Sequence, residues 1–192
     1  MNSRLRSCVV LLVAGFLAAL NAPAGDLTTA MPHVQGTRRM VLEQLERLLA
    51  ADPGLQVIGQ GSWLRGPAAK TAQLSRSYAD PLLGGTSDHD LRLVMQGEDG
   101  QLLSKWKSVR DQLAEGLQNL FKGKSAAEIE QMLIKNYGYT VEQAAAIARQ
   151  GADNVAQVVL KSVNLYPPPQ VMRNVVNDKT ARALFTRAGA VP

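Results

Sequence analysis

Hydrophobic and polar positions in the first half of the chain follow helical and strand-like patterns in turn. Apolar residues recur at helical spacing up to a Pro-Gly stop, which predicts a helix over residues 37–51. The short, partly β-branched run 55–59 predicts a strand, and the mixture of polar and apolar residues at 88–96 predicts a second one. Glycine, proline and small polar residues indicate that 63–79 is mostly loop, with a short helix possible at its start.

Beyond residue 101 the pattern is helical and carries little strand signal. One apolar stripe runs through residues 106–120 and ends at Gly123. Ser125 stands where its hydroxyl would cap a second helix, and Gly138 would stop that helix.

An alanine-rich stretch that opens at Thr140 and reaches about Val163 predicts a third helix, which Gly151 would divide. The prolines at 167–169 prevent its continuation, and a last short helix is expected near 178–187. Strands followed by several helices predict an α+β fold, with a small sheet and a mainly helical C-terminal half.

The first 24 residues have the layout of a cleavable secretory signal peptide. Arg4 and Arg6 form a positive n-region, and residues 9–20 form an apolar h-region. Ala22 and Ala24 then stand three and one positions before the bond between Ala24 and Gly25, where a signal peptidase would cleave. Cleavage there predicts an exported protein, either periplasmic or secreted. The alternative is an uncleaved membrane anchor, but this apolar run is shorter than the ~20 residues that a spanning helix needs.

The expected mature chain has the size and composition of one domain without cysteine chemistry. Removing 24 of the 192 residues leaves 168, in which 25–36 is expected to be a flexible lead-in and 37–192 a single domain. Cys8 leaves with the signal peptide, which excludes disulfides and thiolate metal sites. The loss of Arg4 and Arg6 lowers the net charge from +5 to +3. We expect no transmembrane segment in the mature chain. The sequence contains no Lys/Arg cluster that would indicate a nucleic-acid-binding surface.

Asp88 and Asp90 are the candidate catalytic and metal-binding residues. Side chains alternate along a strand, so both carboxylates would lie on one face, roughly 6–7 Å apart, with His89 packing on the other face. Neighbouring carboxylates are unfavourable without a cation, and Mg²⁺ prefers such oxygen ligands. Arg92 would share the acidic face, where it could steady a phosphate or pair with Asp90. The alternative is that the two acids merely cap or solvate the strand end.

Gly61 and Ser62 are the candidate phosphate-binding residues. They follow the predicted strand 55–59 and open a possible helix, so backbone amides, the helix dipole and the Ser62 hydroxyl could all bind a phosphate. The alternative is an ordinary glycine-containing turn.

Two segments, GSWLRG at 61–66 and TSDHDL at 86–91, together resemble the nucleotidyltransferase superfamily that includes DNA polymerase beta and the oligoadenylate synthetases. The match covers about residues 37–96. It implies a mixed sheet of nucleotidyltransferase type and a nucleoside triphosphate whose phosphates bind Gly61 and Ser62. It also implies two Mg²⁺ ions held by Asp88 and Asp90. The implied reaction is transfer of a nucleotidyl group to an acceptor that the sequence does not identify.

Three features depart from the family pattern. Asp88 follows Ser62 by 26 residues, a longer connection than is usual in the family, so 67–85 would be an inserted loop. The family generally supplies a third carboxylate from a later strand, for which Asp178 is the candidate here. An exported protein also meets little nucleoside triphosphate outside the cytoplasm, so the chain would be either a toxin or effector that acts in another cell or an inactive remnant that retains only the fold.

A noncatalytic envelope or secreted interaction module is the alternative function. In that case the helices after residue 101 would form the binding surface. A hydrolase lacks support, because the mature sequence has no Gly-x-Ser-x-Gly elbow, no His-rich metal motif and no cysteine.

Overall fold

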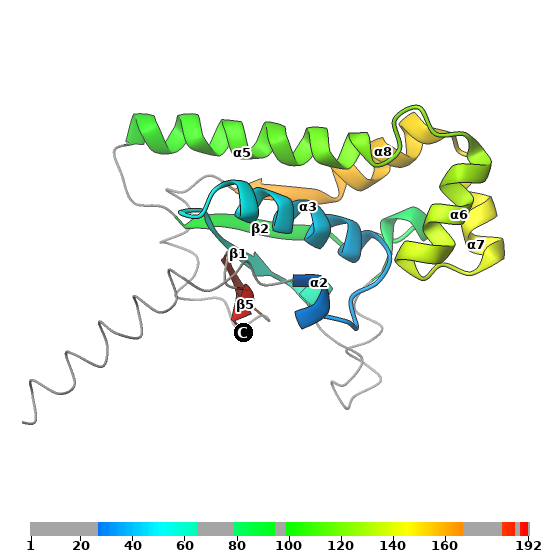
Figure 1. Cartoon of the computed structure of the whole chain (residues 1–192), viewed down its shortest axis with the longest axis horizontal. Helices are drawn as coiled ribbons and strands as arrows, with labels where there is room; N and C mark the ends of the chain where they lie inside the picture. The colour runs from blue at the N-terminus through cyan, green and yellow to red at the C-terminus, as the bar shows by residue number, and fades with distance from the viewer. Residues whose placement is uncertain (1–26, 65–78, 95–98, 167–181, 187–188, 192) are drawn as a thin grey trace, which may run out of the picture.

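The computed structural model describes residues 27–64, 79–94, 99–166, 182–186 and 189–191, which form helices around one sheet (Figure 1). The helices are α2 (Leu27–Ala30), α3 (Thr37–Ala51), α5 (Asp99–Asn119), α6 (Ala126–Tyr137), α7 (Val141–Ala148) and α8 (Ala152–Lys161), with the short 3-10 helices η1 (Ser62–Leu64) and η2 (Pro81–Leu83). The strands are β1 (Gln56–Gln60), β2 (His89–Val94), β3 (Val163–Tyr166), β4 (Arg182–Thr186) and β5 (Gly189–Val191). The predicted α+β class is therefore confirmed.

The strands form one mixed sheet in the order β3-β2-β1-β4-β5. Strand β1 is antiparallel to both β2 and β4, whereas β3 is parallel to β2. A parallel neighbour requires a long crossover, and helices α5 to α8 supply it between β2 and β3. After this crossover, β3 begins beside the start of β2, at the same end of the sheet where β1 ends.

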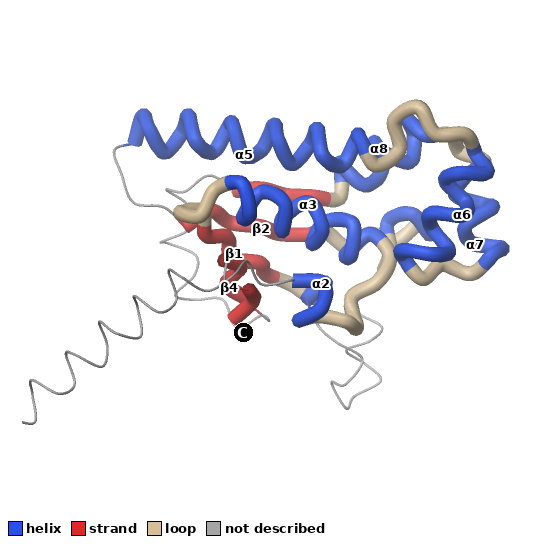
Figure 2. The backbone as a smooth tube through the Cα atoms, viewed as in Figure 1, coloured by secondary structure: helices blue, strands red, loops and turns tan. Residues whose placement is uncertain are grey.

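One face of the sheet packs on the core. Along β2, His89, Leu91 and Leu93 are fully buried, whereas the residues between them are partly exposed. The buried face belongs to the same apolar cluster as residues of α3 and α5. Figure 2 shows α3 and α5 side by side over the strands, with α6 and α7 packed together at one end. The other face of the sheet carries the polar residues of β2.

Local capping groups set the ends of the helices after residue 125. The Ser125 hydroxyl accepts a hydrogen bond from the Glu128 amide, and the Glu128 carboxylate accepts one from the Ser125 amide. Thr140 and Gln143 form the same reciprocal cap at the start of α7. Gly151 separates α7 from α8. The predicted cap at Ser125, the predicted start of a helix after Thr140 and the predicted division at Gly151 are confirmed.

The first elements lie close to their predicted bounds. Helix α3 spans the predicted residues, and β1 is displaced by one residue from 55–59. Helix α5 begins at Asp99, before the apolar stripe starts, and β2 begins at His89, one residue after the predicted start, whereas 95–96 lie outside the described residues. Strand ends depend on where pairing with a neighbour stops, which alternation along one strand does not reveal.

The segment predicted to be a flexible lead-in packs into the core over residues 27–36. Leu27 is fully buried and Val34 is 1% exposed, and both join the main apolar cluster. The Gly36 amide donates a hydrogen bond to the Tyr137 carbonyl at 2.8 Å. The few apolar residues of 27–36 therefore contribute to the core. The free energy gained by burying them outweighs the conformational entropy that this short segment loses.

Two strands of the C-terminal part are corrections to the sequence analysis. Strand β3 follows α8 directly, and β4 occupies 182–186, where the sequence predicts a helix. Both strands gain their backbone partners from β2 and β1, which local propensity does not encode. The predicted signal peptide 1–24 and most of the inserted loop lie outside the described residues. Within the described ranges, no helix combines the length and apolar character needed to cross a membrane.

Candidate functional site

The glycine turn lies at the end of β1, beside Asp90. Gln60, the last residue of β1, pairs with Asp90 in β2, so Gly61 begins the turn next to that aspartate. The φ of Gly61 is +103°, a conformation that favours glycine. A Cβ built on Gly61 would lie 4.0 Å from Oδ2 of Asp90. Strand pairing therefore places the predicted turn close to one of the two predicted aspartates.

Ser62 opens η1, a single 3-10 turn, instead of a longer helix. Its backbone follows Gly61 directly, whereas its side chain lies outside what the structure describes. One short turn aligns too few peptide groups for an appreciable dipole. Any phosphate-binding role of this turn would therefore come from its backbone amides and the absence of a side chain at Gly61.

The two aspartates occupy different environments. Asp88 precedes β2 and is exposed, because the strand begins at His89, whereas Asp90 lies within β2 and is partly buried. Burial raises the pKa of the nearby Tyr166 hydroxyl above its usual value, and the negative charges of Asp90 and then of Asp88 raise it further. The charges of both carboxylates thus act on the Tyr166 hydroxyl. Strand alternation explains the position of Asp90 on this face, but not that of Asp88, which precedes the strand.

Strand β3 provides two donors to Asp90. Nδ2 of Asn164 donates a hydrogen bond to Oδ1 of Asp90 at 3.1 Å, and the Tyr166 hydroxyl donates to the same oxygen at 3.3 Å. The parallel register explains this arrangement, because Asp90 is opposite Asn164 and Arg92 is opposite Tyr166. The sequence analysis missed both β3 residues. The alternation of apolar and polar residues in VNLY at 163–166 was the signal that could have found them.

Arg92 shares this face, as alternation predicts, but its hydrogen-bond partner is Gln60. Nε of Arg92 donates to Oε1 of Gln60, and the guanidinium carbon lies 4.3 Å from the centre of the Tyr166 ring. Nη1 of Arg92 is buried and has no hydrogen-bond partner within the described part of the chain. A buried guanidinium nitrogen is unfavourable without an acceptor, so an anionic ligand oxygen would be bound well there.

His89 lies on the core side of β2, as predicted. Its ring packs edge-on against Trp63, with centroids 5.4 Å apart, and its Nδ1 is 3.1 Å from the Ser162 carbonyl. The carbonyl only accepts hydrogen bonds, so Nδ1 carries the proton. Burial lowers the pKa of His89 to about 4. The histidine is therefore neutral near pH 7 and belongs to the core.

The described residues do not fit the two-ion centre that the resemblance implies. Among them, no group of three or more His, Cys, Asp or Glu side chains is arranged to hold a metal ion. The later strand beside β2 presents Asn164 opposite Asp90, not a third carboxylate. Asp178, the candidate for that role, lies outside the described residues. Asp88 and Asp90 are the two carboxylates whose charges act on the Tyr166 hydroxyl.

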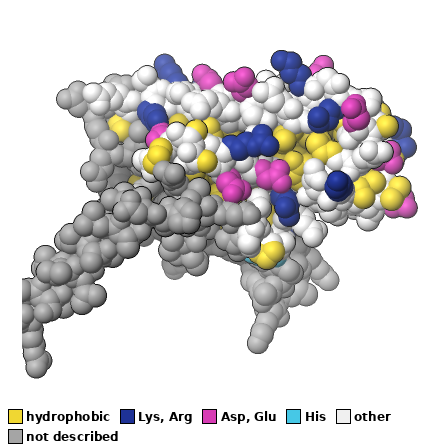
Figure 3. All heavy atoms as spheres, in the orientation of Figure 1, with side chains coloured by type: hydrophobic (Ala, Val, Ile, Leu, Met, Phe, Trp, Pro, Cys, Tyr) yellow, Lys and Arg dark blue, Asp and Glu magenta, His cyan; other side chains and the backbone are white. Residues whose placement is uncertain are grey.

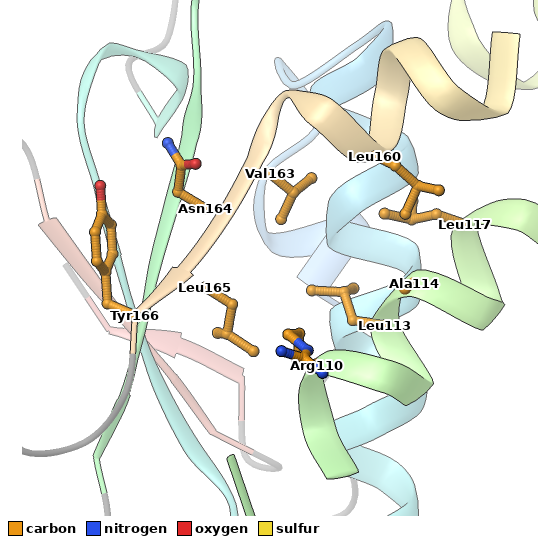
Figure 4. A pocket seen from close by; sticks show the side chains of 9 residues that line it. All are labelled: Arg110, Leu113, Ala114, Leu117, Leu160, Val163, Asn164, Leu165 and Tyr166. Atoms are coloured by element: carbon orange, nitrogen blue, oxygen red, sulfur yellow. The ribbon is translucent and has the colours of Figure 1, made fainter. Parts of the chain in front are cut away.

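A hollow of about 370 Å³ lies along β3. Its lining combines leucines of α5 and α8 with Arg110 and with all four residues of β3. Figure 4 shows the Val163 and Leu165 side chains facing the helices, whereas Asn164 and Tyr166 lie on the other side of the strand. Nε1 of Trp106 donates to the Leu165 carbonyl at 3.0 Å, which ties α5 to this edge of the sheet. The hollow therefore adjoins the polar site, because Asn164 and Tyr166 line it and also bond to Asp90.

Charges of both signs are interspersed on the face seen in Figure 3. Several lie in pairs on the helices, such as Arg39 with Glu43 and Arg110 with Asp111. Within that face, the charges of the described residues form no continuous basic stripe of the kind that binds nucleic acid.

No family model, curated protein or solved structure matches the chain. The residues of the site and their geometry are therefore the basis for assigning a function.

Proposed function

We propose that this chain is an exported nucleotidyltransferase-like protein that binds a nucleoside triphosphate beside Gly61 and Asp90. The observation that carries the proposal is the juxtaposition of the glycine turn at the end of β1 with Asp90 near the start of β2. These features are the two halves of the family pattern and lie far apart in the sequence. Antiparallel pairing of β1 with β2 brings them together.

The polar face of the sheet supplies groups suited to phosphate oxygens. Gly61 has no side chain, so a phosphate could approach the backbone amides of the turn closely. Arg92 adds a positive charge, and its Nη1 lacks a partner among the described residues. Mg²⁺, when bound, would neutralise phosphate charge next to Asp88 and Asp90.

Transfer of a nucleotidyl group is the reaction that the resemblance implies. The signal peptide would carry the protein out of the cytoplasm. Nucleoside triphosphate is scarce outside the cytoplasm. A toxin or effector that enters another cell would meet the nucleotide there.

Calorimetric titration of the purified exported chain with ATP and with GTP tests the proposal. We expect binding that requires Mg²⁺ and weakens by about tenfold or more in Asp88→Asn/Asp90→Asn. Both substitutions keep side-chain size and remove two negative charges. Without metal, the melting temperature should hold or rise, because two neighbouring carboxylates no longer repel each other.

The matched control is Asp111→Asn/Asp153→Asn, which removes two charges from exposed helical positions. This variant should bind nucleotide as the wild type does. Absence of binding by the wild type, or equal binding by both double variants, would contradict the proposed site.

A noncatalytic interaction module is the second candidate. The observation that favours it is the internal pairing of the polar face, since Asp90 already accepts two hydrogen bonds and Arg92 already donates to Gln60. A network of this kind can serve the structure alone. In that case the wild type would bind neither ATP nor GTP, with or without Mg²⁺.

A further inference from the structure

Asn164 lies beside Asp90 on a later strand of the sheet. The family pattern takes a third carboxylate from a strand later in the chain, and β3 is the described later strand beside β2. In the register of these two strands, Asn164 is opposite Asp90. The side chain has almost the shape of aspartate but carries no charge.

We propose that the neutral Asn164 leaves the site without the carboxylate that a second cation would need, so that nucleotide binds there with one divalent ion. This inference rests on the nucleotide binding proposed above. Asn164 acts as a positioning residue, because its hydrogen bond is to Asp90.

The hydrogen bond to Asp90 sets the orientation of the Asn164 amide. Nδ2 donates to Oδ1 of Asp90 at 3.1 Å. Rotating the amide by half a turn would place its oxygen against that carboxylate oxygen, and two acceptors repel at this distance. Asn164 therefore turns N–H groups toward the site, and N–H groups do not bind cations.

The surroundings of Oδ1 of Asp90 disfavour a bridging role for this carboxylate. Two cations would need carboxylate oxygens on both sides of Asp90. Oδ1 instead accepts hydrogen bonds from Asn164 and from the Tyr166 hydroxyl. Oδ2, on the side of Gly61, remains for one cation. The Arg92 guanidinium, stacked on Tyr166, adds a positive charge that would repel a second ion.

Manganese can count the ions, because free and bound Mn²⁺ differ in electron paramagnetic resonance. The exported chain is titrated with Mn²⁺ in the presence of a saturating, non-hydrolysable ATP analogue. We expect one bound Mn²⁺ per chain for the wild type and two for Asn164→Asp. Without nucleotide, added Mn²⁺ should raise the melting temperature of Asn164→Asp more than that of the wild type, because the added carboxylate repels Asp90 until a cation binds.

Two further variants control the experiment. Asn136→Asp adds the same charge at an exposed position of α6 and should keep one ion. Asn164→Ala removes the amide without adding charge and should also keep one ion, which separates loss of the hydrogen bond from gain of a ligand. If Asn164→Asp does not fold, the wild-type stoichiometry still tests the one-ion site, because two bound ions would overturn it.

Two bound ions in the wild type would overturn the inference and leave nucleotide binding intact. A folded Asn164→Asp variant that still binds one ion would also overturn it, because the missing carboxylate at position 164 would then not be what limits the site to one ion. Absence of nucleotide binding by the wild type would instead remove the proposed function on which the inference rests.

Discussion

The two faces of β2 carry opposite kinds of chemistry within one short strand. On the core face, Leu91 and Leu93 are fully buried and His89 is held neutral by burial. On the other face, Asp90 and Arg92 bond to polar partners on the neighbouring strands. The comparison shows that a titratable residue inside a motif need not share its function. His89 stands between two aspartates in the sequence, yet it packs on the opposite side of the sheet.

The buried face should dominate stability. Leu91→Ala leaves a cavity in a fully buried position and should lower the free energy of unfolding by about 2–5 kcal/mol. Val94→Ala, on the partly exposed face, should cost roughly 1 kcal/mol. Urea denaturation of both variants measures the difference. Equal losses would mean that the two faces do not differ in burial as described.

The pH dependence of stability should depend on His89. Its pKa is lowered from 6.5 to about 4 in the folded state, so the unfolded chain binds this proton first as the pH falls. Neutral His89 leaves the free energy of unfolding undiminished above pH 6.5. As the pH falls to about 4, proton binding by the unfolded chain lowers that free energy by about 3 kcal/mol in all.

The variant His89→Asn keeps an N–H donor near the position of Nδ1 but does not titrate in this range. Its free energy of unfolding should therefore fall less than that of the wild type between pH 6.5 and pH 4. Denaturant melts at several pH values give both curves. Parallel curves would contradict the assignment of a neutral, buried His89.

The polar face should respond to substitution mainly through ligand binding. Gly61→Ala places a side chain at φ +103° and should cost about 1–2 kcal/mol in stability. Gly123→Ala is the matched control, because Gly123 also has a positive φ, +73°, but no atom within 4 Å of an added Cβ. Both variants should lose similar stability, whereas only Gly61→Ala should weaken nucleotide binding. A similar loss of binding in the two variants would assign the effect to stability alone.

Helices and their ends were largely predictable, because their signals lie within a few residues. The reciprocal caps at Ser125 and Thr140 need only a partner three residues later. Gly138 and Gly151 end or separate helices through their own backbone conformations. In the candidate site, the glycine turn and the aspartate pair were recognisable from local motifs. The packing of residues 27–36 was not, because the few apolar residues there show no period of their own.

The amino-acid sequence by itself determined where most helices lie, where β1 and β2 run, and which residues of β2 face the core. These features follow from capping and periodicity, which act over a few residues. Only the tertiary structure decided that β3 lies parallel to β2 and that Asn164 and Tyr166 bind Asp90. Such pairing joins residues more than 70 positions apart, and its register depends on how the intervening helices pack. The hydrogen bonds around Asp90 depend on this distant pairing.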